Sequence, residues 1–320
     1  MFEKVLAPID LSEHSRKILD CIRQLPNVKE VVLLNVVAKV HLAEVQGPSA
    51  ELRNAEAKLE ELAKHLGKAE FKIKTRAEIM PEEGSVSSVI RGVADEENVS
   101  LIVMGIGVKS AVEGAMQGSY LGRISRDVLC HDDTPLLIIR RRSLDGEKAL
   151  QEDFCSHIFA KVLLPTDLSE PARAAIFFVA KLRGIKNMVL LHVVPEGGSK
   201  EEMDAKVKAA TNALNALAEE LAGKEGLKVM PPIGVRLSEA ALRCRICSKG
   251  LDITCHVVVG NIVQEINEMA DKENVSLIAM SSMGKGSSGE GQVGRTAYGV
   301  ASTATRPVLV IRTDKVPVFR

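Results

Sequence analysis

The chain has 320 residues, of which 46% are hydrophobic and 26% are charged, as in ordinary globular proteins. Its 42 Lys and Arg residues balance its 42 Asp and Glu residues, so there is no excess positive charge for nucleic acid or an anionic membrane. Aromatic residues make up 3% of the chain, which argues against a platform that stacks bases. We therefore expect neither a nucleic-acid partner nor a membrane partner.

The cellular location is predicted from the N-terminus and the cysteines. The first ten residues, MFEKVLAPID, carry an acid at Glu3 and do not resemble a secretory signal. No apolar run reaches the roughly 18 residues of a membrane-spanning helix. The six cysteines lack the spacing of a disulfide framework. We therefore expect a cytoplasmic protein.

Short aliphatic runs alternate with helical patterns along the first 140 residues. Several of these runs are unbroken Val, Ile and Leu, which is typical of strands covered by helices on both faces. The predicted strands are Lys4–Ile9, Glu30–Val37, Phe71–Ile79, Leu101–Met104 and Leu136–Arg140. The predicted helices are Glu13–Leu25, Ser49–Leu66, Ser85–Asn98 and Ser119–Leu129. This alternation predicts an α/β fold, a Rossmann-like, doubly wound, five-stranded parallel sheet.

The same pattern is repeated in the second half of the chain. KVLAPIDLSE at Lys4–Glu13 matches KVLLPTDLSE at Lys161–Glu170 in eight of ten positions, at an offset of 157 residues. ADEENVSLIVM at Ala94–Met104 matches ADKENVSLIAM at Ala270–Met280 in nine of eleven, at an offset of 176. The second copy therefore carries 19 extra residues. The last predicted strand returns at an offset of 172, so four residues are lost before it, which could shorten the last helix.

These repeats indicate two tandem domains produced by duplication, with an insertion in the second. The expected boundaries are 1–142 for the first domain, 143–157 for a polar linker and 158–320 for the second domain. A long helix near Lys200–Ala222 takes the place of the helix at Ser49–Leu66. In such folds a ligand lies beyond the carboxyl ends of the strands, where the chain order reverses. The loops after the first and fourth strands are therefore the candidate site.

The first strand ends in a carboxylate in both copies. The sequences are Pro8-Ile9-Asp10 and Pro165-Thr166-Asp167. A carboxylate here can accept hydrogen bonds from a ribose or a base. It can equally cap a helix, because Asp10 and Asp167, like the serines two residues later, lie at predicted helix starts. Both interpretations stay open.

The fourth strand runs into a glycine-rich loop in both copies. In the first copy the loop begins at Met104-Gly105 and reaches Gly118-Ser119-Tyr120, where the last helix is predicted to open. In the second copy it begins at Met280-Ser281, contains Gly284 and ends at Gly294-Arg295-Thr296, which we align with Gly118-Ser119-Tyr120. A glycine loop ending at a helix N-terminus favours an anion such as phosphate.

Together these motifs resemble tandem universal stress protein (UspA-type) domains. The ATP-binding branch of that family has an Asp in a Pro-x-Asp context and a Gly-x-x-Gly, nine residues, Gly-Ser/Thr loop. The first copy has Val108 in place of the second glycine, and the second copy has Ser281 in place of the first glycine and Arg295 in place of the Ser/Thr. The resemblance also assigns Val36 and Val193 to the adenine side, and implies an adenine nucleotide alpha hydrolase-like fold.

What the resemblance implies is a regulatory stress protein that binds ATP or AMP, with Mg²⁺ accompanying ATP, in at least one copy. It also implies that Leu136–Arg140 and Val308–Arg312 pair as an intrachain pseudo-dimer, with a homodimer as a further assembly. The alternatives are an interaction scaffold with degenerate pockets, or a slow ATPase that phosphorylates itself at Ser119. The residues form no evident nucleophile–base–orienter constellation.

Three other features have simpler explanations. Cys244-x-x-Cys247 with Cys255-His256 superficially suggests zinc, but a second ligand pair at the usual spacing is absent. The stretch Arg236–Lys249 falls in the inserted region and is predicted as an extra helix. Arg140–Arg142 is interpreted as the start of a solvated linker.

Overall fold

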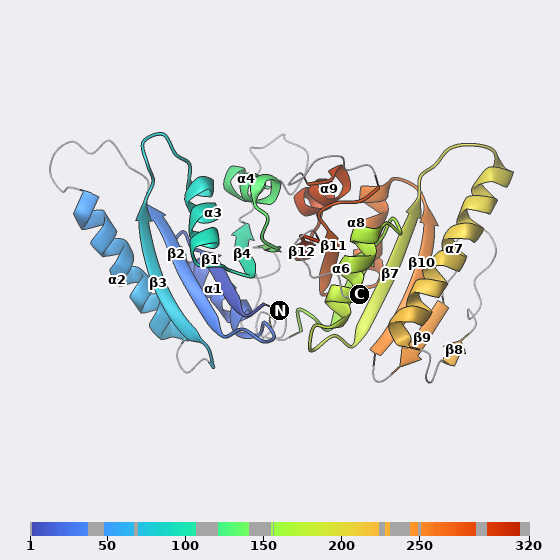
Figure 1. Cartoon of the computed structure of the whole chain (residues 1–320), viewed down its shortest axis with the longest axis horizontal. Helices are drawn as coiled ribbons and strands as arrows, with labels where there is room; N and C mark the ends of the chain where they lie inside the picture. Colours follow the sequence, from blue (N-terminus) through green and yellow to red (C-terminus); the bar gives the residue numbers. More distant parts are fainter. Residues whose placement is uncertain are drawn as a thin grey trace. The chain divides into compact units, whose positions relative to one another are not determined.

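The computed structural model describes residues 2–37, 48–66, 70–106, 121–140, 155, 157–223, 228–230, 244–248, 251–285 and 293–313. The chain divides into two compact units, Met1–Ser156 and His157–Arg320, called domain 1 and domain 2 below. Both have the predicted α/β architecture (Figure 1). Within the described ranges, no helix has the length and apolar character needed to cross a membrane.

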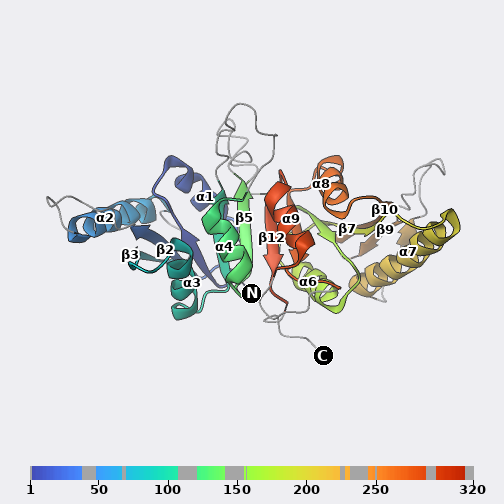
Figure 2. The same cartoon turned by 90° about the horizontal axis from the view of Figure 1, so that it is seen from above.

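Domain 1 contains a parallel sheet in the order β3-β2-β1-β4-β5. Its strands are β1 (Lys4–Pro8), β2 (Glu30–Val37), β3 (Lys72–Ile79), β4 (Leu101–Ile106) and β5 (Leu136–Arg140). Its helices are α1 (Glu13–Arg23), α2 (Pro48–Leu66), α3 (Val86–Glu96) and α4 (Arg123–His131). Helices α1 and α2 cover one face of the sheet and α3 and α4 the other (Figure 2). The strand order reverses between β1 and β4, and this is the switch point where such folds bind ligands.

Domain 2 repeats this arrangement, with its sheet in the order β12-β11-β6-β7-β10-β9-β8. The strands that correspond to domain 1 are β6 (Lys161–Pro165), β7 (Asn187–Val194), β10 (Leu251–Val259), β11 (Leu277–Ser281) and β12 (Val308–Ile311). The helices are α6 (Glu170–Ala180), α7 (Lys200–Ala222), α8 (Ile262–Lys272) and α9 (Arg295–Thr303). The switch point therefore lies between β6 and β11, at the ends of the strands that carry Asp167 and Ser281.

The insertion in domain 2 builds strands rather than the predicted extra helix. Strand β9 (Cys244–Ser248) pairs antiparallel with β10, and β8 (Lys228–Met230) pairs antiparallel with β9. The prediction was wrong for residues 244–248 because β10 offers an open edge, whose unpaired backbone groups accept another strand. Residues 231–243 lie outside the described part of the chain.

The last helix begins later in domain 1 than predicted. Helix α4 starts at Arg123, after Gly122, instead of at Ser119. Helix α9 starts at Arg295 after Gly294, both helices have nine residues, and the two glycines have nearly the same backbone angles. The structural counterpart of Gly294-Arg295 is thus Gly122-Arg123, four residues from the alignment expected above. The four missing residues in domain 2 are lost from the preceding loop, and the helix keeps its length.

Arg140 was expected at the start of a solvated linker, and this expectation was wrong. Its side chain is buried, and that burial lowers the pKa of the guanidinium to about 10. Arg312, at the corresponding end of β12, is buried as well. The two arginines therefore end the last strand of each domain inside the structure. Arg141 and Arg142 lie outside the described residues.

Gly105 is retained in domain 1 because of packing. A Cβ atom at this position would collide with the Cδ1 atom of Ile18, which projects from α1. The counterparts in domain 2 are Ser281 and, at the 157-residue offset, Ala175 on α6. In domain 1 a small strand residue, Gly105, lies beside a large helix residue, Ile18. In domain 2 the strand residue is the larger Ser281 and the helix residue is the smaller Ala175. The difference between Gly105 and Ser281 is therefore matched by an opposite difference in size between Ile18 and Ala175.

This pairing predicts non-additive stability changes in domain 1. Gly105→Ser should cost about 1–3 kcal/mol by overpacking against Ile18, and Ile18→Ala should cost about 2–4 kcal/mol by leaving a cavity. In the double variant the serine fills space that the alanine leaves, so the combined loss should be smaller than the sum by about 1 kcal/mol or more. Urea unfolding of the four proteins measures this coupling. Additive losses would show that the two positions are independent.

A disulfide joins Cys21 on α1 to Cys155, and both cysteines are buried. The bridge closes a sequence separation of 134 residues. The spacing of the six cysteines predicted no disulfide framework. This bond could not be predicted from spacing, because its two cysteines lie 134 residues apart. The bond ties the segment just before domain 2 to the first helix of domain 1.

The bridge predicts a redox-dependent stability of domain 1. A cross-link over so long a loop restricts the unfolded chain and typically stabilises by about 2–4 kcal/mol. Cys21→Ser combined with Cys155→Ser should lower the free energy of unfolding of the oxidised protein by that amount, measured by urea unfolding. Reductant should have no further effect on the double variant. Cys130→Ser, which removes a thiol outside the disulfide, is the matched control and should keep the response to reductant. Equal unfolding curves for the oxidised wild type and the double variant would rule out the stabilising role.

Candidate functional site

Domain 2 has a cavity of about 660 Å³ at the carboxyl ends of β6, β7 and β11 and the start of α9. That volume is within the usual range for small-molecule sites. All ten residues predicted for this copy line the cavity, although they come from four separate parts of the chain. They are Pro165, Thr166, Asp167, Val193, Met280, Ser281, Gly284, Gly294, Arg295 and Thr296.

The carboxylate of Asp167 organises the floor of the cavity. Its Oδ1 accepts a hydrogen bond from the backbone N–H of Ser169 at 3.0 Å, and its Oδ2 accepts one from the backbone N–H of Lys285 at 2.5 Å. Burial raises the pKa of this carboxyl, but the hydrogen bonds from Ser169 and Lys285 outweigh it, and the net pKa is lowered. Asp167 is therefore charged at neutral pH and links the loops after β6 and β11.

Asp167 forms a turn before α6, and Ser169, not Asp167, is the N-cap of that helix. Ser169 caps α6, because its side chain accepts from the N–H of Ala172 at 3.4 Å. Asp167 closes a local turn around Leu168, whose φ of 62° lies in the left-handed region. Domain 1 has the same turn: Asp10 Oδ1 accepts from the N–H of Ser12, and Leu11 has a φ of 60°. A left-handed leucine is strained, and both copies keep it where it presents the carboxylate.

Two glycines of the loop are required by close approach. A Cβ atom at Gly284 would collide with the carboxylate of Asp167. Gly294 donates its backbone N–H to the carbonyl of Ser282 at 2.8 Å, and a Cβ atom there would lie 3.3 Å from that same carbonyl oxygen. Both positions retained from the family pattern thus shape the loop itself.

Ser281, which replaces the first glycine of that pattern, is buried. Its hydroxyl accepts from the N–H of Met283 at 3.2 Å and lies 3.3 Å from the hydroxyl of Thr313. The sequence suggested that this side chain would occupy ligand space. In the structure the hydroxyl is instead engaged by the loop and by Thr313, two residues after β12.

One end of the cavity is positively charged. Arg295 occupies the first position of α9, and Lys285 lies after β11 in the segment that precedes α9. The N-terminus of a helix already carries a partial positive charge, so an arginine there is unfavourable unless an anion is bound. The same helix end offers backbone N–H groups to a phosphate. This end of the cavity therefore suits an anionic group.

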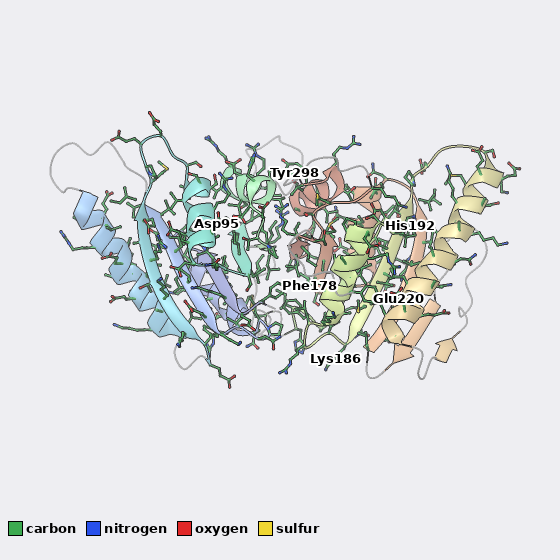
Figure 3. All side chains as sticks on the ribbon, viewed as in Figure 1. Asp95, Phe178, Lys186, His192, Glu220 and Tyr298 are labelled. Carbon is green, nitrogen blue, oxygen red and sulfur yellow. A yellow bond between two sulfur atoms is a disulfide. The ribbon has the colours of Figure 1, made fainter. Side chains whose placement is uncertain are left out.

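Sequence reasoning missed several residues of the cavity. Leu191, Pro195, Ile262 and Ile266 add an aliphatic wall around Val193. His192, labelled in Figure 3, also lines the cavity. It is the one polar residue of the run MVLLHVV, so it was interpreted as part of a buried strand. Its counterpart at the 157-residue offset, Asn35, could have drawn attention to it, because both are polar residues within a buried strand.

His192 is fixed by one strong contact. Its Nδ1 lies 2.8 Å from the carbonyl oxygen of Thr166, so Nδ1 carries the proton and donates it. Burial lowers the pKa of the ring, and the positive charge of Lys285 lowers it further. In domain 1, Asn35 Nδ2 donates to the corresponding carbonyl of Ile9 at 2.7 Å.

In domain 1 the structure describes part of the predicted site. Pro8 ends β1 and Ile9 and Asp10 follow it, Val36 lies in β2, and Met104 and Gly105 lie in β4. Strands β2 and β4 flank β1, so these residues meet at the switch point. Val108, Gly118, Ser119 and Tyr120 lie outside the described residues.

The described residues include no group of three or more His, Cys, Asp or Glu side chains that could hold a metal ion. Cys255 is buried, and its thiol faces the carbonyl of Leu214. The side chains of Cys244 and Cys247 are not among those described.

Comparisons with known proteins agree with the fold. The model of the universal stress protein family matches residues 1–140 and 159–312. Universal stress protein MJ0577 of Methanocaldococcus jannaschii is 28% identical over 159 residues, which cover 49% of this chain and 97% of that protein.

Solved structures match over nearly the whole chain. A universal stress protein from Archaeoglobus fulgidus has a TM-score of 0.60 at 22% identity, covering 97% of this chain and 96% of its own. A putative universal stress protein from Pseudomonas aeruginosa has a TM-score of 0.58 at 14% identity, covering 97% and 93%. At these identities they support the fold, and the family match carries the classification. With both halves matched, the chain belongs to the universal stress protein family as a tandem of two such domains.

Proposed function

We propose that domain 2 binds an adenine nucleotide, ATP or AMP, and that the protein serves the stress response as a nucleotide-dependent regulator. The observation that carries this proposal is that one cavity joins an aliphatic wall, a charged carboxylate and a cationic helix end. A nucleotide has three parts of matching chemistry: a flat base, a sugar rich in hydroxyl donors, and phosphates.

The wall around Val193 supports binding of the base. Leu191, Val193, Pro195, Ile262 and Ile266 come from β7, its following loop and α8, and all face the cavity. Aliphatic side chains bury the faces of a base by removing apolar surface from water. The family resemblance assigns Val193 to the adenine side, which agrees with this placement.

Asp167 supports binding of the ribose. Each oxygen of its carboxylate accepts a backbone hydrogen bond and the Ser169 side chain supplies a third, which leaves one of about four acceptor positions for a ligand donor. Ribose hydroxyls are donors of the right kind. Because the carboxylate is held from two loops, little order has to be gained when a ligand arrives.

Arg295 and Lys285 support binding of the phosphates. Arginine can hold a phosphate with two parallel hydrogen bonds, and the N-terminus of α9 adds backbone donors beside it. We expect this arrangement to hold a nucleotide and to hydrolyse ATP weakly at most. Mg²⁺ would enter with ATP, held by its phosphates.

Titration calorimetry with ATP, ADP and AMP tests the proposal. Asp167→Asn keeps the shape of the side chain but removes its charge and replaces an acceptor oxygen with a donor, so all three affinities should fall about tenfold or more. Arg295→Ser should weaken ATP by about tenfold and AMP by less, because the arginine lies at the phosphate end. Lys206→Ser, which removes an exposed cation on α7, is the control and should leave binding unchanged.

Absence of heat and of a thermal shift with millimolar ATP, ADP and AMP would contradict nucleotide binding. That result would leave the interaction scaffold as the function to pursue. Steady release of phosphate from ATP that is lost in Asp167→Asn would instead indicate an ATPase.

A further inference from the structure

His192 is the polar residue of the cavity that the family pattern does not include. It lines the cavity from β7, one residue before Val193 and bonded to the residue before Asp167. It therefore lies between the wall assigned to the base and the carboxylate assigned to the ribose. A ligand that fills both regions passes this ring.

The contact to Thr166 decides which nitrogen faces the ligand as an acceptor. A carbonyl oxygen can only accept, so Nδ1 holds its proton and Nε2 of the neutral ring holds a lone pair. The neutral ring and the carboxylate of Asp167 are thus two acceptors that line the same cavity, because the ring is bonded to Thr166, the residue before Asp167. A protonated ring would present a donor on both nitrogens, and Nε2 could no longer accept.

The surroundings keep the ring neutral near pH 7. Burial lowers its pKa most, the hydrogen bond to Thr166 raises it, and the charge of Lys285, after β11, lowers it. Asp167, after β6, acts in the opposite direction, and Arg295 on α9 lines the same cavity. On the other side β10 places Val257 in register with His192, and α8 contributes the apolar Ile262 and Ile266.

We propose that His192 is a second hydrogen-bond acceptor for the nucleoside part of the ligand, beside Asp167, and that the cavity holds its ligand most tightly while this ring is neutral. This proposal rests on the proposed function of domain 2. It adds a specificity residue: the ring selects a hydroxyl or amino donor on the ligand. It also makes binding dependent on pH, since a proton on Nε2 and the ligand's donor compete for one lone pair.

Domain 1 provides the variant for the test. Asn35 makes the corresponding bond to the carbonyl of Ile9, so His192→Asn should keep the bond to Thr166. The amide oxygen can still accept, but it does not titrate. His192→Leu removes both the bond and the acceptor. His131→Asn changes an exposed histidine of domain 1 that contacts the backbone carbonyl of Asp127 and is the control.

ATP affinity is measured by calorimetry from pH 8.0 to 5.0 for the four proteins. Between pH 7.5 and 5.0 the wild type and His131→Asn should lose about tenfold more affinity than His192→Asn, since the ring takes up a proton in this range. Comparison at equal pH removes the titration of the phosphates, which all variants share. At pH 7.5 His192→Asn should bind about two- to fivefold more weakly, and His192→Leu about tenfold more weakly. Thermal melts at each pH confirm that the variants are folded.

Two analogues identify the donor. If a ribose hydroxyl is read, 2′-deoxy-ATP or 3′-deoxy-ATP should bind with the same pH profile to the wild type and His192→Asn. If the 6-amino group is read, inosine triphosphate should show that behaviour. Parallel pH profiles of wild type and His192→Asn with ATP would overturn the role of His192 while leaving nucleotide binding intact. Failure of the wild type to bind at any pH would instead refute the proposed function.

Discussion

At the end of the first strand of each domain, a side-chain hydrogen bond from the neighbouring strand adds to the backbone bonds, and the site depends on it. A polar side chain from the neighbouring strand, Asn35 or His192, donates to the carbonyl just before the aspartate. The chain then turns through a left-handed leucine and enters the first helix. Because the carbonyl cannot move and the aspartate closes the turn, the carboxylate is presented at one place. In domain 2 the loop after β11 is built upon that carboxylate, through Lys285 and the glycine beside it.

Much of this architecture follows from hydrophobic patterning alone. The five strands predicted for domain 1 are all present, most of them as aliphatic runs although β3 is largely polar, and β2, β5 and α7 have the predicted bounds. A strand covered by helices on both faces needs apolar residues at nearly every position, so its sequence is easily recognised. The same patterning failed where burial does not dictate the structure. Strand β9 forms because an edge is available, and α4 begins at Arg123 after Gly122, whose backbone is extended. Neither condition is visible in a local window.

The ten predicted residues of the domain 2 site meet in one cavity because a parallel sheet brings the carboxyl ends of its strands to one edge. The details of each contact could not be predicted. Gly105 is explained by Ile18, a residue of another element, and Ser281 by Met283 and Thr313. His192 resembled a buried strand residue until the fold showed what its ring faces. Sequence motifs predicted residues that line one cavity, whereas the partner of each side chain had to come from the structure.

The two domains share the support of the site and differ in its chemistry. Ile9, Asn35 and Gly105 in domain 1 correspond to Thr166, His192 and Ser281 in domain 2. The exchange of Asn35 for His192 keeps a bond to the same carbonyl, and the exchange of Gly105 for Ser281 keeps the joint volume of a strand and a helix residue. The exchange of Asn35 for His192 also changes what a ligand would meet, because it places a titratable ring at the cavity. A duplicated fold can vary its ligand in this way at little cost in stability, since the retained contact preserves the backbone while the exposed atoms of the side chain change.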